Sequence, residues 1–170
     1  MSYTNLTTKR RNKEMEQLPI DLRIGTVDDA PFVFNSWLKS FRSSTFAKQI
    51  SNTIYYHDHH IVIEKLLKNN DVIIACSKSD PNQLYGFICA GQTDGIFTLH
   101  YIYVKHPFRR MGIAKALFNA FEHDPSHASI YTHRTKAAEK LQDRYNMVHH
   151  PYIALGSHHE KKDETPQDND

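Results

Sequence analysis

The chain has 170 residues, and its 21 Lys and Arg residues nearly balance its 19 Asp and Glu residues, leaving a formal net charge of +2. That length suits one domain with flanking segments, and so small a charge is no argument for nucleic-acid binding. No apolar run approaches the roughly 20 residues that span a bilayer, and no apolar secretory signal opens the chain, so we expect a cytoplasmic protein without a membrane partner. Cys76 and Cys89 lie in apolar runs and are expected to be buried and reduced.

The first elements are predicted near the N-terminus. Residues 1–17 are polar and rich in Lys and Arg without periodicity, which predicts a disordered basic arm. Residues 20–24 alternate apolar and polar, as a half-buried strand does. Thr26 and Asp29 have the spacing of a capping box, and Pro31 suits a first helical turn. The predicted helix that follows gathers its apolar residues on one face: Val33, Phe34, Trp37, Leu38 and Phe41.

The next stretch offers two possible sites. Residues 42–56 are expected to form a loop and a short helix, and Phe46, Tyr55 and Tyr56 either cover the core or line a ligand pocket. The run from His57 to His60 suggests a metal, but residues 61–67 have helical character. Adjacent His residues on a helix point about 100 degrees apart and do not easily share one ion. We therefore interpret the run as a polar helix start and predict no metal site.

Three antiparallel strands are predicted next, at residues 71–76, 84–90 and 96–104, separated by turns rich in Asp, Asn, Gly and Pro. Regular alternation along the third of them would place four side chains on one face, namely Thr98, His100, Ile102 and Val104.

A basic turn then leads into a helix with one apolar face. The pattern Arg109-x-x-Gly112-x-Ala114 sets cations and small residues where the helix begins. The free N–H groups and the positive dipole end of a helix start favour phosphate, and Gly112 would let an anion approach the backbone. An ordinary solvated turn is the alternative. Apolar residues of the helix share one face: Ile113, Ala116, Leu117, Ala120 and Phe121.

The rest of the chain is predicted as a short strand at 129–132, a helix at 135–144, a last strand at 149–155 and a disordered acidic tail at 157–170. Residues 18–156 then form one domain with the order β-α-α-β-β-β-α-β-α-β, an α+β layered sheet.

The stretch from Leu99 to Ala114 resembles motif A of the GNAT superfamily, the Gcn5-related N-acetyltransferases, whose hallmark is Gln/Arg-x-x-Gly-x-Gly/Ala after the fourth strand. The resemblance implies a mixed, mostly antiparallel sheet with helices on both faces and a splayed central cleft. It also implies acetyl-CoA (CoA) as cofactor, with the pantetheine arm along Ile102, Tyr103 and Val104. The pyrophosphate would lie on the backbone of six residues: Arg109, Arg110, Met111, Gly112, Ile113 and Ala114.

Residues 23–42 are similar to small acetyltransferase-like proteins encoded by tailed bacteriophages, in which case the cytoplasm would be that of the host.

The resemblance also suggests catalytic residues. His100 matches the second of two catalytic histidines in the arylalkylamine branch, and Thr98, at the first position, cannot act as a base. A base is needed because an alkyl amine is mostly protonated at neutral pH, and His suits that task, although a hydrogen-bonded core His is the alternative. The family's Tyr acid is replaced by Gln142, so Tyr145, three residues on, is the candidate acid unless it is a core residue.

Three functions remain open from the sequence. The first is transfer of an acetyl group from acetyl-CoA to a primary amine of a protein or small molecule. The second is a catalytically degenerate GNAT domain that binds CoA or a protein partner, which Gln142 and Thr98 favour. The third is acylation of a modified nucleobase or another nucleic-acid-directed role, supported by the basic arm and surface aromatics. A homodimer is compatible with the resemblance.

Overall fold

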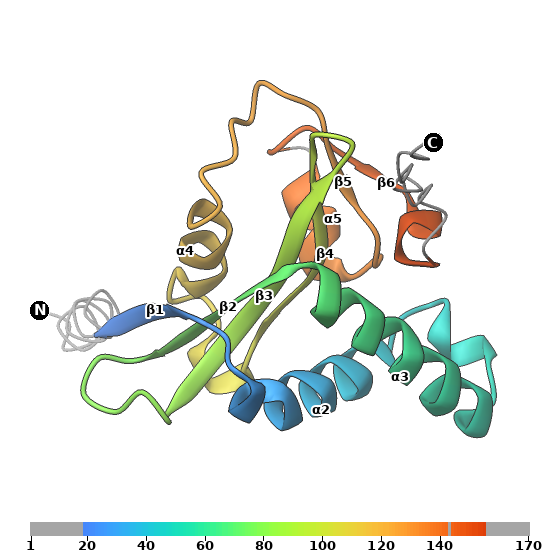
Figure 1. The fold of residues 1–170 in the computed structure, drawn as a ribbon, viewed down its shortest axis with the longest axis horizontal. Coiled ribbons are helices and arrows are strands. Elements are labelled where there is room, and N and C mark those ends of the chain that lie inside the picture. Colours follow the sequence, from blue (N-terminus) through green and yellow to red (C-terminus); the bar gives the residue numbers. More distant parts are fainter. Residues whose placement is uncertain (1–18, 143, 156–170) are drawn as a thin grey trace, which may run out of the picture.

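The computed structural model describes residues 19–142 and 144–155 (Figure 1). The predicted arm at 1–17 and tail at 157–170 lie outside these residues. The described helices and strands are β1 (Ile20–Ile24), α2 (Ala30–Phe41), α3 (Asn52–Asn69), β2 (Asp71–Ser77), β3 (Leu84–Thr93), β4 (Ile96–Val104), α4 (Ile113–Asn119), β5 (Ser129–Tyr131), α5 (Lys136–Gln142) and β6 (Met147–His149). Their order is the predicted one.

The six strands form a single sheet in which each strand lies beside its neighbours in the sequence, in the order β1-β2-β3-β4-β5-β6. The first four strands are antiparallel, whereas β5 is parallel to β4 and β6 is parallel to β5. Helices α4 and α5 supply the crossovers that parallel neighbours require. This arrangement confirms the predicted α+β class with a mostly antiparallel sheet.

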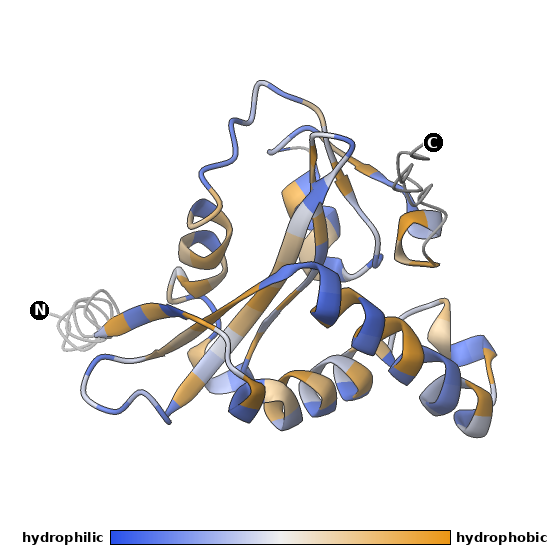
Figure 2. Ribbon diagram, viewed as in Figure 1, coloured by the Kyte–Doolittle hydropathy of each residue, from blue (hydrophilic) through white to orange (hydrophobic). Residues whose placement is uncertain are grey.

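Two cores lie on opposite faces of the sheet. On one face, α2 and α3 pack over an aromatic cluster in which the Trp37 and Tyr101 rings stack with centroids 4.5 Å apart. On the other face, α4 contributes Leu117 and Phe118 to a core that also contains Leu99 of β4. Figure 1 shows α2 and α3 on one side of the sheet and α4 on the other. Figure 2 shows hydrophobic and hydrophilic residues alternating around α2 and α3. Each fully buried side chain of this size stabilises the fold by about 1.5–3 kcal/mol.

The predicted capping box precedes α2. The backbone N–H of Thr26 donates to the Asp29 carboxylate at 2.8 Å, and Arg23 donates to both Asp29 oxygens at 2.7 and 2.8 Å. These hydrogen bonds, the Arg23 pair first, hold the pKa of Asp29 below its usual value although burial opposes them. The pair ties β1 to the start of α2.

The second helix begins earlier than predicted. The Ser51 side chain accepts a hydrogen bond from the Ile54 N–H, so α3 starts at Asn52. Of the aromatic residues left open by the sequence, Tyr55 belongs to the core, and its hydroxyl donates to the Leu38 carbonyl at 2.7 Å. Phe46 and Tyr56 remain largely exposed.

The C-terminal prediction was wrong in part. The chain forms β6 at Met147–His149 and then a 3-10 helix at Pro151–Leu155, instead of one strand at 149–155. Pro151 lacks an N–H and has a fixed φ, which suits a first helical turn and not a paired strand. None of the helices in the described part of the chain is long and apolar enough to cross a membrane.

Candidate functional site: the β4 bulge and the loop before α4

The central strand contains a β-bulge at His100. Cys89 of β3 pairs with Tyr101 and the next residue, Ala90, pairs with Leu99, so His100 is one extra residue in β4. His100 and Tyr101 therefore both face α2 and α3, and the strand resumes with Ile102 in the core beneath α4. The predicted shared face was wrong, because the bulge shifts the alternation by one residue. The Thr98 side chain lies on the same face of the sheet as His100, whereas Ile102 and Val104 lie on the opposite face.

His100 is buried, and both nitrogens of its ring have side-chain partners. Its Nε2 lies 3.1 Å from the Oδ1 of Asn70, and its Nδ1 lies 3.1 Å from the Oγ1 of Thr132. The Thr132 oxygen in turn lies 2.9 Å from the Nδ1 of His133. The predicted base is thus one member of a hydrogen-bonded chain that runs from the end of α3, over β4, to the segment after β5.

The far end of this chain is an aromatic and histidine cluster. His133 is buried among Trp37, Phe41 and His59, with ring centroids 4.9 to 5.1 Å away. Burial lowers the pKa of His133 well below its usual value, with the neighbouring His59 and His100 adding to the effect. Burial also lowers the pKa of His59 to about 4. Both histidines are therefore neutral at pH 7.

The neighbouring rings of His59 and His60 point in different directions. His59 is buried and stacks on Phe41 with centroids 4.8 Å apart, whereas His60 is exposed and stacks on Phe34 at 4.5 Å. The two rings diverge as the helical geometry predicts. Within the described residues, no three His, Cys, Asp or Glu side chains converge as metal ligands.

The strands β4 and β5 are paired over a short length only. Thr98 and Leu99 pair with β5, and the Thr132 N–H donates to the Leu99 carbonyl at 3.0 Å. Among the described residues, the predicted pantetheine segment Ile102–Val104 pairs with β3 alone. The Val104 carbonyl accepts a hydrogen bond from Arg109 Nε at 3.0 Å, so Arg109 joins the end of β4 to the loop.

The loop after β4 has an unusual backbone. Gly112 is the N-cap of α4 with a φ of +78°, and Arg110 also has a positive φ, of 66°. A Cβ at Gly112 would find nothing within 4 Å, so the space in front of this residue is open. The buried Ile113 side chain fixes the start of α4 on the core, while Arg109 and Arg110 stay exposed. Met111 and Ala114 pack partly on that core. The main chain at Gly112 is thus open to the approach of an anion, because no Cβ stands in front of it.

Tyr145 lies on the other face of the sheet from His100. It is buried beneath α4, and its ring packs on Phe118 with centroids 4.2 Å apart. The structure therefore does not bring the two predicted catalytic side chains together. It shows instead that Gln142, at the family's Tyr position, accepts a 2.9 Å hydrogen bond from the hydroxyl of Tyr131.

Asn70, Thr132 and Tyr131 were not predicted as site residues. Asn70 and Thr132 stand 30 and 32 residues from His100 in the chain, and none of the three belongs to a recognisable motif. For Asn70, the sequence offers one signal, the glycine at position 91 directly after the predicted strand at 84–90, since a glycine in a strand often marks a close approach of another group. In the structure, Gly91 belongs to β3, and a Cβ there would come within 2.3 Å of the Asn70 oxygen.

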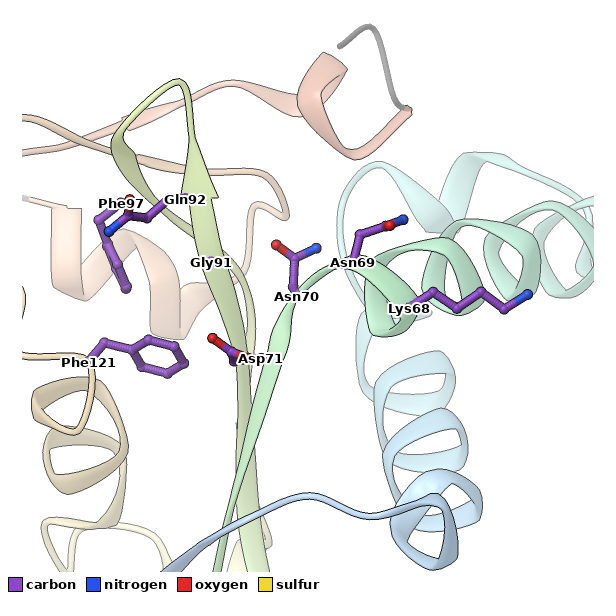
Figure 3. Close-up of a pocket in the computed structure, with 8 residues that line it drawn as sticks. All are labelled: Lys68, Asn69, Asn70, Asp71, Gly91, Gln92, Phe97 and Phe121. Carbon is purple, nitrogen blue, oxygen red and sulfur yellow. The ribbon is translucent and has the colours of Figure 1, made fainter. Parts of the chain in front are cut away.

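A surface cavity of about 510 Å³ lies beside Asn70, where α3 ends and β2 begins (Figure 3). Phe97 and Phe121 form an apolar side, and Asp71 and Gln92 contribute polar groups. In Figure 3 the amide oxygen of Asn70 is on the side of β3 and its nitrogen on the side of α3. Asn70 thus lines this cavity and also contacts the His100 ring.

The sequence signature of the Acetyltransferase (GNAT) family matches residues 31–144, which include the bulge, the loop and α5. The chain belongs to the GNAT acetyltransferase family. This membership confirms the resemblance, and acetyl-CoA is the cofactor that belongs with it. No curated protein sequence matches the chain.

One of the solved structures similar to this chain has a TM-score above 0.5 and shares its fold. A presumed acetyl transferase of Pyrococcus furiosus is 18% identical, with a TM-score of 0.52 over 74% of this chain and 91% of its own. The PaiA N-acetyltransferase of Thermoplasma acidophilum, solved with coenzyme A, is 21% identical, with a TM-score of 0.42 over 61% of this chain and 69% of its own. A GNAT family N-acetyltransferase of Escherichia coli, solved with CoA, is 17% identical, with a TM-score of 0.41 over 62% and 55%.

Proposed function

We propose that this protein is an acetyl-CoA-dependent N-acetyltransferase that acts on a primary amine of a protein or small molecule. One observation carries the proposal. In a chain of this family, the loop at Arg109–Ala114 has a glycine of positive φ facing open space, with two exposed arginines beside it.

The loop and the edge of β4 would hold the cofactor. Main-chain N–H groups from Arg109 to Ala114 would bind its pyrophosphate, and the main chain of Ile102–Val104 would bind its pantetheine arm. The cofactor supplies the thioester that carries the acetyl group. The protein's own part is to hold the donor against β4 and to accept a proton from the amine.

His100 is the proposed base, since a neutral imidazole can take a proton near neutral pH. For the thiolate that leaves, Tyr145 is the acid proposed from the sequence. Tyr131 is a second candidate, because its hydroxyl reaches Gln142 at the family's acid position. A thiolate with a pKa near 8.5 also takes a proton from water, so loss of either phenol should slow transfer without abolishing it.

A test combines binding and turnover. Acetyl-CoA should raise the melting temperature of the wild type, and Gly112→Asp should remove that shift because its carboxylate repels the pyrophosphate. Release of free thiol with a panel of primary amines measures turnover, and His100→Ala should lower kcat more than it weakens cofactor binding. A wild type that acetyl-CoA leaves unchanged would contradict the proposal.

A second function has specific support. His100 is buried with both nitrogens engaged, and Gln142 cannot donate a proton as an acid. These features favour a domain that binds CoA or a protein partner without catalysis. Saturable cofactor binding without transfer to any amine would select this function.

We also propose a cytoplasmic location, which suits the two unpaired, buried cysteines Cys76 and Cys89. If the gene is a bacteriophage gene, as the resemblance of residues 23–42 suggests, the cytoplasm is that of the infected host.

A further inference from the structure

The side chain of Asn70 has one defined orientation. Its Nδ2 donates to the Leu66 carbonyl at 2.9 Å, one of the carbonyls that the end of α3 leaves without an intrahelical partner. Turning the amide over would set its oxygen against that carbonyl, with two acceptors facing each other. The Oδ1 atom therefore points away from α3 toward β3, where Gly91 leaves room for it.

This orientation determines where His100 carries its proton. An amide oxygen only accepts hydrogen bonds, so the His100 Nε2, 3.1 Å from Asn70 Oδ1, must be the protonated nitrogen of the neutral ring. Nδ1 then has a lone pair, which accepts from the Thr132 hydroxyl at 3.1 Å. With its one hydrogen used, the Thr132 oxygen accepts from the Nδ1–H of His133 at 2.9 Å.

The hydrogen bonds consequently run in one direction, from His133 through Thr132, His100 and Asn70 to Leu66. We infer that Asn70 is a positioning residue that fixes the Nε2–H tautomer of His100, so that this histidine takes up a proton at Nδ1, on the side of Thr132 and β5. The inference rests on the proposed function for its catalytic consequence.

Proton uptake at Nδ1 keeps the same hydrogen-bond partners around the His100 ring. The Thr132 hydroxyl hydrogen passes to Nδ1, and the amine substrate returns a proton to the Thr132 oxygen. In the resulting imidazolium both nitrogens are donors. The Thr132 hydroxyl then turns toward the His100 carbonyl, which lies 3.5 Å from its oxygen, and accepts from Nδ1–H. Asn70 keeps accepting from Nε2–H throughout.

Among the described residues, the charges that act on the His133 end of the chain come from histidines. The titratable group next to Thr132 is His133, from the segment after β5, and beyond it lie His59 of α3 and His149 of β6. Burial lowers the pKa of all three. They are neutral while His100 is working near neutral pH.

The tautomer can be measured without any reference to activity. Long-range ¹⁵N–¹H spectra of the full chain, with His100→Gln to assign the signals, should show a protonated Nε2 and a bare Nδ1 at neutral pH. In Asn70→Leu the amide oxygen is gone, and we expect His100 to populate the Nδ1–H form, donating to Thr132. Asn70→Asp keeps an acceptor oxygen and should restore the Nε2–H form.

A neighbouring residue provides the matched control. Asn69 donates to the Lys65 carbonyl at 2.8 Å, as Asn70 does to Leu66, but Asn69 is exposed at the surface. Asn69→Leu should therefore leave the tautomer unchanged. Gly91→Ala displaces the Asn70 oxygen without removing it, so it should also shift His100 to the Nδ1–H form. It replaces Asn70→Leu as the test if Asn70→Leu does not fold.

Kinetics test the catalytic consequence. Asn70→Leu should lower kcat at least tenfold with an acetyl-CoA KM within about twofold of the wild type. Asn70→Asp should recover most of kcat, and its acidic limb should move to higher pH because a carboxylate favours the imidazolium. A wild-type Nδ1–H tautomer overturns the inference, as does an Asn70→Leu variant with unchanged tautomer or unchanged kcat. A wild type with the expected tautomer but no transfer to any amine contradicts the proposed function instead.

Discussion

Replacing Gly112 with alanine should separate the conformational role of this residue from its role in binding. At a φ of +78°, a non-glycine residue costs roughly 1–2 kcal/mol. No clash adds to this cost, because a Cβ at Gly112 has nothing within 4 Å. For a chain of 170 residues each kcal/mol corresponds to roughly 2–4 °C in melting temperature, so Gly112→Ala should melt about 2–8 °C lower.

A second glycine provides the control. Gly95, in the turn between β3 and β4, has a φ of +77° and equally open space, so Gly95→Ala should lose the same stability. Only Gly112→Ala should bind acetyl-CoA more weakly, because its methyl group would enter the space proposed for the pyrophosphate.

The size of the effect can be stated in advance. Ligand at 100 times Kd stabilises the wild type by about 2.7 kcal/mol, and a tenfold loss of affinity reduces this to about 1.4 kcal/mol at the same concentration. Thermal shift with and without acetyl-CoA measures both quantities for each variant. Equal cofactor shifts in the two alanine variants would refute the assignment of this loop to the pyrophosphate.

Three further predictions concern stability and proton transfer. Because the pKa of Asp29 is lowered in the folded state, its contribution to stability is complete above the unfolded pKa near 3.9 and is lost as pH falls through the folded pKa. Asp29→Asn should therefore lower the free energy of unfolding by about 2 kcal/mol at pH 7 and by progressively less in acid, as measured by urea unfolding. His59 is neutral when folded, with a pKa of about 4, so its own contribution to stability should fall between pH 6.5 and 4 by up to about 1.4 kcal/mol per pH unit. The lowered pKa of His133 adds to the slope of the wild type, and His59→Phe should remove only the part due to His59. Tyr131→Phe and Tyr145→Phe distinguish the two candidate acids. Replacing the residue that acts as the acid should lower kcat and leave the acetyl-CoA Kd unchanged. If both variants keep the kcat of the wild type, a phenolic acid is excluded.

Much of the fold could be predicted because its signals are local. The capping box at Thr26 and Asp29, the apolar face of α2 and the strand–turn–helix pattern around Gly112 each involve residues a few positions apart. The resemblance to the GNAT family then predicted how these elements are arranged, as a mostly antiparallel sheet with helices on both faces. The GNAT match over residues 31–144 confirms the family, and the observed six-stranded sheet confirms the arrangement of the strands.

The environment of the predicted base could not be derived in this way. Alternation predicts faces only while the strand pairs regularly, and no sequence signal marks the extra residue at His100. Its partners Asn70 and Thr132 come from different elements, so their contacts depend on the completed sheet. The predicted strand at 149–155 failed for a simpler reason, since Pro151 favours a helical turn over a ladder.

The bulge in β4 also bears on how such a site can arise or disappear. Because Leu99 and Tyr101 already pair with successive residues of β3, excision of codon 100 would leave a continuous ladder, with every remaining β4 side chain on its present face. His100 is thus an inserted residue, and the pairing of β4 with β3 does not depend on it. One inserted or deleted residue is therefore enough to add or remove the proposed base, without a change of register elsewhere in the sheet.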